Sequence, residues 1–105
     1  MIINVNKNNF IKEVASSDKL VLVDLYATWC GPCKALAPIL EELSEKYADE
    51  IKVVKVDVDE EESLAIKFGV VNLPTVLFFK NGKAATSFAG LKSAADIEKI
   101  IEKLL

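Results

Sequence analysis

The chain has 105 residues, of which 51% are hydrophobic and 28% are charged, a size and balance that predict one folded domain over residues 1–105 and argue against intrinsic disorder. Its 13 Lys and Arg residues against 16 Asp and Glu residues give a formal net charge of −3, which excludes a general binder of the nucleic-acid phosphate backbone. No apolar run approaches the roughly 20 residues that span a bilayer, and no signal peptide is apparent, so we expect a cytoplasmic protein that binds neither nucleic acid nor membrane.

The first half of the chain predicts two helices, one before and one after a buried strand in the sequence. After an N-terminal strand, the apolar residues among residues 10–15 suggest a short helix. Residues 20–26 are apolar at nearly every position, which is typical of a strand covered by helices on both faces. From Cys33 to Tyr47, apolar residues recur at helical spacing, and Pro38 should kink this helix because it has no N–H to donate.

The next segments predict strands that alternate with a helix. Residues 51–58 are rich in Val and predict a second buried strand. Residues 60–68 predict a weaker helix, and Gly69 is well placed just past its end. Residues 75–79 are apolar on both parities and predict a third buried strand.

A hairpin and a helix close the chain. The dipeptide Asn81-Gly82 predicts a two-residue hairpin turn, since both residues tolerate positive φ, and residues 83–88 should return antiparallel. The final helix has one apolar stripe between residues 97 and 105, and Ser93 is typical of its N-cap. The resulting order, βαβαβαββα, indicates a three-layer α/β domain, because parallel strands joined by helices have helices on both faces of the sheet.

The only two cysteines, Cys30 and Cys33, stand between a predicted strand and a predicted helix, in the motif Trp29-Cys30-Gly31-Pro32-Cys33-Lys34. Two residues three apart at the start of a helix have Cα atoms about 5 Å apart, inside the range of an unstrained disulfide. Pro32 suits the first turn, where its missing N–H is not needed. Gly31 leaves the backbone open beside the sulfur atoms.

The position of each cysteine relative to the helix predicts its role. Cys30 lies just before the helix and faces the unpaired N–H groups and the positive end of the helix dipole. This environment stabilises a thiolate and lowers its pKa below the free value of about 8.5. Cys33 lies inside the first turn, where it should be more buried and less reactive. We therefore expect Cys30 to attack a disulfide and Cys33 to resolve the product.

Two other readings of the cysteine pair are weaker. A closed structural zinc site usually has four ligands, and this sequence contains no other Cys and no His. Two inert cysteines packed as small apolar residues are also conceivable. The flanking Trp, Gly and Pro and the position between strand and helix argue against inert cysteines.

The six-residue cysteine motif resembles the signature of the thioredoxin family over its full length, and the resemblance extends over essentially the whole chain. Four further features match positions of that family: its buried acid, the lysine beside that acid, the cis-proline loop that faces the cysteines, and the glycine of the docking surface. In this sequence they are Asp24, Lys55, Leu73-Pro74-Thr75 and Gly90. This combination is far more specific than a lone pair of cysteines.

The resemblance implies the thioredoxin fold, a three-layer α/β/α arrangement with a central mixed five-stranded sheet flanked by four helices. It implies a thiol–disulfide oxidoreductase that acts as a general protein disulfide reductase. The implied partners are protein disulfide substrates and a thioredoxin reductase, which supplies electrons, and a monomer is expected. The redox-active disulfide of Cys30 and Cys33 serves in place of any metal or organic cofactor.

The resemblance also implies roles for individual residues. Asp24 would accept the proton of Cys33, and Lys55 would tune Asp24. The substrate chain would dock on an apolar surface, where the backbone of Leu73 would pair with it as a neighbouring strand does. The residues of that surface are Trp29, Leu73, Pro74 and Gly90.

Chemistry alone leaves three of these positions open. Asp24 could lie at a strand end and reach solvent, since Asp is seldom fully buried. Lys55 could extend its charged end into water from a Val-rich strand. Pro74 could be a trans proline that starts a strand, because only about 5–6% of X–Pro bonds are cis. The resemblance favours a buried acid, a neighbouring lysine and a cis proline.

Two other functions are compatible with the same residues. The same apolar face could belong to a docking or assembly subunit whose redox state is incidental. A disulfide isomerase or oxidase would carry the same cysteine pair, and its equilibrium with glutathione would separate it from a reductase. Tyr26 departs from the family pattern, because many bacterial members have a second Trp there.

Overall fold

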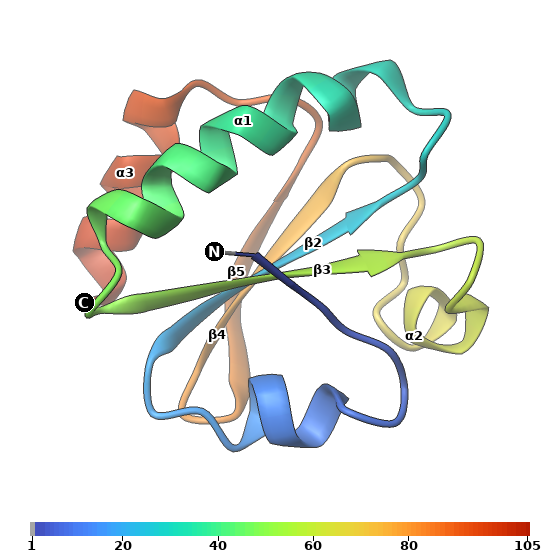
Figure 1. The fold of residues 1–105 in the computed structure, drawn as a ribbon, viewed down its shortest axis with the longest axis horizontal. Coiled ribbons are helices and arrows are strands. Elements are labelled where there is room, and N and C mark those ends of the chain that lie inside the picture. The colour runs from blue at the N-terminus through green and yellow to red at the C-terminus, as the bar shows by residue number, and fades with distance from the viewer. Residues whose placement is uncertain (1) are drawn as a thin grey trace.

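A mixed sheet of five strands forms the middle of the molecule in the computed structural model, which describes residues 2–105 (Figure 1). The strand order is β1-β3-β2-β4-β5; β1, β3 and β2 run parallel, and β4 runs antiparallel to its neighbours β2 and β5. The strands are β1 (Ile2–Asn4), β2 (Leu20–Tyr26), β3 (Ile51–Asp57), β4 (Thr75–Lys80) and β5 (Lys83–Ala89). The predicted mixed five-stranded sheet is confirmed.

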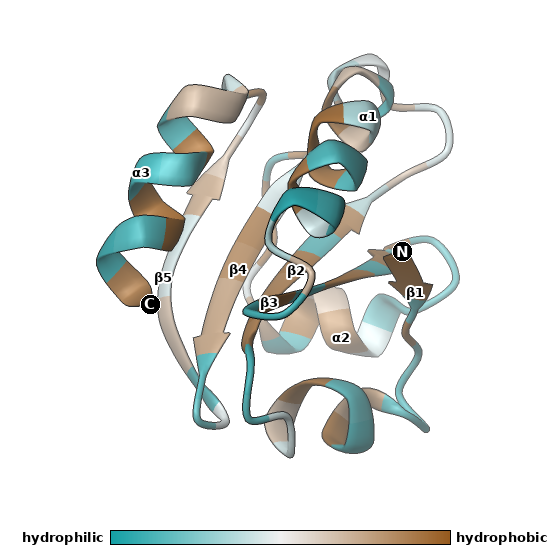
Figure 2. Cartoon of the chain, turned by 60° about the vertical axis from the view of Figure 1, so that its left-hand side comes forward, coloured by the Kyte–Doolittle hydropathy of each residue, from teal (hydrophilic) through white to brown (hydrophobic). Residues whose placement is uncertain are grey.

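Four helices within the described residues cover the two faces of this sheet (Figures 1 and 2). They are η1 (Ile11–Ala15, a short π-type helix), α1 (Gly31–Lys46), α2 (Glu62–Lys67) and α3 (Ala94–Leu104). One apolar core joins the sheet to α1 and α3, and a second joins it to η1 and α2. The three-layer arrangement is therefore confirmed. Within residues 2–105, no helix is both long and apolar enough to cross a membrane.

The side chains of β2 alternate between these two cores, as the pleat of a strand requires. Leu22 belongs to the core under α1 and α3, whereas Val23 belongs to the core over η1 and α2. Asp24 has the parity of Leu22 and therefore faces the α1 side. Its Cα partner in β3 is Lys55, which has the parity of Val53 in the same core. The pleat thus puts an acid and a lysine side by side beneath α1.

The predicted boundaries differ from the observed ones by one or two residues. β3 ends at Asp57 rather than at residue 58, and α2 is confined to residues 62–67 rather than 60–68. The hairpin turn has φ 53° at Asn81 and 80° at Gly82, as that dipeptide predicts. The side chain of Ser93 accepts a hydrogen bond at 3.2 Å from a backbone N–H of the first turn of α3, which confirms the predicted N-cap.

Candidate active site

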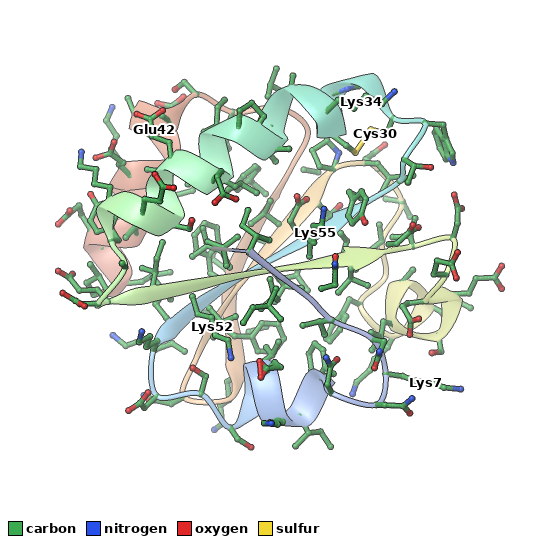
Figure 3. All side chains as sticks on the ribbon, viewed as in Figure 1. Lys7, Cys30, Lys34, Glu42, Lys52 and Lys55 are labelled. Carbon is green, nitrogen blue, oxygen red and sulfur yellow. A yellow bond between two sulfur atoms is a disulfide. The ribbon has the colours of Figure 1, made fainter. Side chains whose placement is uncertain are left out.

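The cysteine pair lies where the chain leaves β2 and enters α1. Cys30 is the N-cap residue of α1, and its Sγ accepts a hydrogen bond from the backbone N–H of Cys33 at 3.2 Å. The two cysteines form a disulfide, and their Cα atoms are 5.3 Å apart, close to the separation expected from helix geometry. Figure 3 shows Cys30 at the N-terminal end of α1 with Lys34 nearby. A sulfur at this position faces the unpaired N–H groups of the helix, which stabilise a thiolate.

The two cysteines are buried to nearly the same extent, although their positions predict that Cys33 is the more buried one. Cys30 is 6% exposed and Cys33 is 4% exposed in the disulfide form. Both pack with Ala27 in one small apolar cluster, against which Val58 and Leu73 lie. The contrast between the cysteines therefore comes from their positions relative to the helix end, and hardly from burial.

The loop before β4 closes the other side of the cysteine cluster. The Leu73–Pro74 peptide bond is cis, as the resemblance implied. The carbonyl oxygen of Pro74 accepts a hydrogen bond at 2.8 Å from the N–H of Gly90, whose φ of 85° suits a residue without a side chain. The fold therefore places Gly90 beside the Leu73–Pro74 loop, and all three residues belong to the predicted docking surface.

Trp29 is held at the surface beside the cysteines. Its side chain is 68% exposed, and its Nε1–H donates a hydrogen bond to Asp59 Oδ2 at 2.8 Å. An exposed indole with one fixed edge presents a flat apolar face to solvent. The sequence alone did not indicate Asp59, because nothing local in an acidic run marks which carboxylate faces a residue 30 positions earlier.

Asp24 is a buried acid, as the resemblance implied. Its side chain is 5% exposed, and Oδ1 has no hydrogen-bond partner among the described residues. Burial disfavours the charged form and raises the pKa of Asp24 from 3.8 to about 7, while the charge of Lys55 opposes that rise. A carboxyl group with this pKa can take up or release a proton near neutral pH.

Lys55 lies near Asp24 without forming an ion pair with it. Within the described residues, no salt bridge joins these two side chains. The ammonium of Lys55 instead lies 5.1 Å from the centre of the Tyr26 ring, a cation–π geometry. Figure 3 shows Lys55 on the sheet below α1. The Tyr26 contact could not be foreseen, because it depends on the rotamers of two side chains on different strands.

A small cavity lies between these groups and Cys33. It has a volume of about 250 Å³, and its lining includes Asp24, Tyr26, Cys33 and Lys55. A cavity of this size, with polar groups on its wall, has room for water. Asp24 and Cys33 therefore border the same cavity.

The family model described as Thioredoxin matches residues 1–103 of the chain. The chain belongs to the thioredoxin family. Thioredoxins are oxidoreductases that work by thiol–disulfide exchange, and Cys30 and Cys33 are the disulfide-forming pair of this member. Among residues 2–105, no group of three or more His, Cys, Asp or Glu side chains is arranged to hold a metal ion.

Named relatives from bacteria and plants are similar to the chain over most of its length. It is 42% identical over 90 residues to the thioredoxin of Bacillus subtilis, and the match covers 86% of each chain. It is 41% identical over 102 residues to thioredoxin C-2 of Corynebacterium nephridii, covering 97% of this chain and 94% of the relative. It is 43% identical over 101 residues to the chloroplastic M-type thioredoxin of Pisum sativum; the match covers 96% of this chain and 59% of that relative.

Proposed function

We propose that the protein is a general protein disulfide reductase, that residues 1–105 form one domain and that the protein works as a monomer. The observation that carries this proposal is the cysteine pair at the N-terminus of α1, enclosed by the Leu73–Pro74 loop and backed by the buried Asp24. Gly31 and Pro32 support it, since they keep the turn between the cysteines small and free of titratable groups.

The reaction begins with the thiolate of Cys30. Its Sγ attacks one sulfur of a substrate disulfide; the substrate S–S bond breaks, and the first substrate thiolate leaves. Cys33 then loses its proton and attacks Sγ of Cys30, breaking the mixed disulfide. The second substrate thiolate leaves, so the substrate gains two electrons and the protein is left with the Cys30–Cys33 disulfide.

Asp24 acts in the second step as the acceptor of the proton from Cys33, through the cavity that they share. Its pKa of about 7 suits this task, because the group is partly ionised at neutral pH and can return the proton to water. Lys55 tunes Asp24, since its positive charge lowers the pKa that burial raises. Neither side chain needs to contact the substrate.

The substrate chain docks on the apolar surface around the disulfide. Trp29 offers an exposed ring, and Gly90 keeps the approach to Pro74 clear of a side chain. Backbone groups of Leu73 pair with the substrate chain in the manner of an added strand. This docking reads backbone and apolar surface more than particular side chains, which suits a reductase with many substrates.

The reductase cycle needs a source of two electrons, and we assign that role to a thioredoxin reductase. We place this cycle in the cytoplasm, because thiols are kept reduced there. No metal or organic cofactor takes part, since both electrons pass through sulfur. The bacterial thioredoxins among the relatives support this assignment.

Two measurements test the proposal. Wild-type protein with dithiothreitol as electron donor should reduce the disulfides of a test protein, and Cys30→Ser should abolish the acceleration. Equilibration with glutathione should give a potential near that of strong dithiol reductants, about −270 mV. A potential near −120 mV would identify an oxidase instead. Equal activity of the wild type and Cys30→Ser would overturn the proposal.

A further inference from the structure

The turn that follows β3 is organised by Asp57. Asp57 is the last residue of β3, and its Oδ1 accepts a hydrogen bond from the backbone N–H of Asp59 at 2.9 Å. Its own carbonyl oxygen accepts a hydrogen bond at 2.8 Å from the N–H of Glu61. An aspartate that accepts from the N–H two residues later stabilises a tight turn. The side chain and the backbone of one residue thus fix the direction in which Asp59 leaves the strand.

Asp59 extends this arrangement to the active site. Its Oδ2 accepts the hydrogen bond of Trp29 Nε1–H at 2.8 Å, and that N–H is the only polar group of the indole. Because β2 and β3 are parallel, the loops that follow them leave the same edge of the sheet (Figure 1). Two consecutive hydrogen bonds therefore connect the end of β3 with the side chain next to Cys30.

Trp29 depends on this hydrogen bond for a fixed orientation. It is 68% exposed, and it lies outside the three apolar clusters of the described residues. An exposed side chain without a restraining contact changes rotamer within picoseconds to nanoseconds. A ring that is already held loses less conformational freedom when a partner covers it, so a fixed indole binds more tightly than a free one.

Resting on the disulfide reductase function proposed above, we propose that Asp57 is a positioning residue for substrate docking. It holds Asp59, and Asp59 holds the indole of Trp29 in the orientation that receives the substrate polypeptide. Asp57 acts as a hydrogen-bond acceptor rather than as a charge, and it contacts neither the substrate nor the cysteine sulfurs. The exchange chemistry of the cysteines therefore does not depend on it.

The mobility of the indole tests the first part of this proposal. Trp29 is the only tryptophan of the sequence, so its indole N–H gives a single NMR signal in each variant. The order parameter of Nε1 should be near the rigid value of about 0.85 in the wild type and below about 0.6 in Asp57→Ala. Asp57→Asn should keep the wild-type value, because an amide oxygen accepts the same hydrogen bond without the charge. Glu60→Ala, which removes an exposed carboxylate from the same turn, is the matched control and should also keep it.

Two disulfides of different size test the effect on docking. Insulin presents a polypeptide to the indole, whereas hydroxyethyl disulfide is too small to cover the ring and reports on the sulfur chemistry. Reduced Asp57→Ala should react with insulin about fivefold more slowly than the wild type, the weakening expected from one lost hydrogen bond. Its rate with hydroxyethyl disulfide should stay near that of the wild type, which excludes misfolding as the cause. Asp57→Asn should restore the rate with insulin.

A double variant tests whether Asp57 acts through Asp59. Asp59→Ala should slow the reaction with insulin at least as much as Asp57→Ala does. The protein with both changes should be no slower than Asp59→Ala alone, because both residues act on one indole. Additive losses would show that Asp57 acts by another route and would overturn the inference.

The remaining outcomes separate this inference from the proposed function. An indole that is equally ordered in Asp57→Ala and in the wild type would overturn the inference and leave the reductase function standing. An Asp57→Asn protein as defective as Asp57→Ala would do the same, because the charge would then be the cause. A wild-type protein that reduces neither disulfide would overturn the reductase function, and the docking role of Asp57 with it.

Discussion

Replacing Asp24 by Asn should stabilise the protein near neutral pH and slow its redox cycle. The substitution keeps the size of the side chain and removes the buried negative charge. Because the folded-state pKa is raised, the folded protein binds the proton of Asp24 more tightly than the unfolded chain does. The free-energy penalty for ionising Asp24 is absent below the unfolded value of 3.8, grows as the pH rises, and is complete above about 7.

The magnitude follows from the two pKa values. A rise from 3.8 to about 7 corresponds to roughly 4 kcal/mol for holding the charged form in the fold. Asp24→Asn should therefore raise the free energy of unfolding by up to about 4 kcal/mol at pH 7, and by less than about 1 kcal/mol at pH 4. The exposed Asp49 is a matched control, and Asp49→Asn should change stability by less than about 0.5 kcal/mol at either pH.

Paired urea melts of the oxidised proteins at pH 4 and pH 7 measure the stability, and a disulfide reduction assay measures the redox cycle. The variant should resolve mixed disulfides more slowly at neutral pH, because Cys33 loses its proton acceptor. An Asp24→Asn protein that is less stable than wild type at pH 7, and equally fast, would refute both parts of this reasoning.

Two further predictions concern other positions. Tyr26→Leu should lower the pKa of Asp24, because the ammonium of Lys55 loses the ring that it contacts and becomes free to approach the carboxylate; Tyr26→Phe should leave that pKa near its wild-type value. Titration of the Asp24 carboxyl carbon by NMR measures both, and an unchanged pKa in the Leu variant would contradict the role of the ring. Gly82→Ala should destabilise the protein more than Gly69→Ala, because both residues have positive φ but only a Cβ at Gly82 would lie 2.8 Å from a backbone carbonyl oxygen of η1. Urea melts compare the two, and equal losses, each about 1–2 kcal/mol from backbone strain alone, would contradict the close approach.

Much of the fold could be predicted because local patterns and the global arrangement agree. The double-sided apolar run of residues 20–26 matches β2 at both ends, since a strand covered on both faces has no polar alternation to blur its limits. Asn81-Gly82 predicted the hairpin turn correctly, because few dipeptides accept positive φ at two successive positions. The helix predicted over residues 60–68 was too long. Glu60 and Glu61 precede the first turn of α2, and Leu64 is the one buried residue of the helix.

Some features of the candidate site could be predicted from local sequence, and others could not. The spacing of Cys30 and Cys33 predicted a bond that the helix start permits, and the fold places it there. By contrast, the partner of Trp29 and the contact between Lys55 and Tyr26 depend on side chains from separate elements. The near-equal burial of the two cysteines has the same origin, because Ala27, Val58 and Leu73, from three separate loops, pack against them.

The most direct test of the central claim is the identity of the attacking sulfur. The reduced wild-type protein should be treated with a limiting amount of an alkylating agent at neutral pH, digested and mapped by mass spectrometry. Cys30, at the N-cap of α1, should carry nearly all of the label. Label found chiefly on Cys33 would contradict the assignment of Cys30 as the nucleophile and the mechanism built on it.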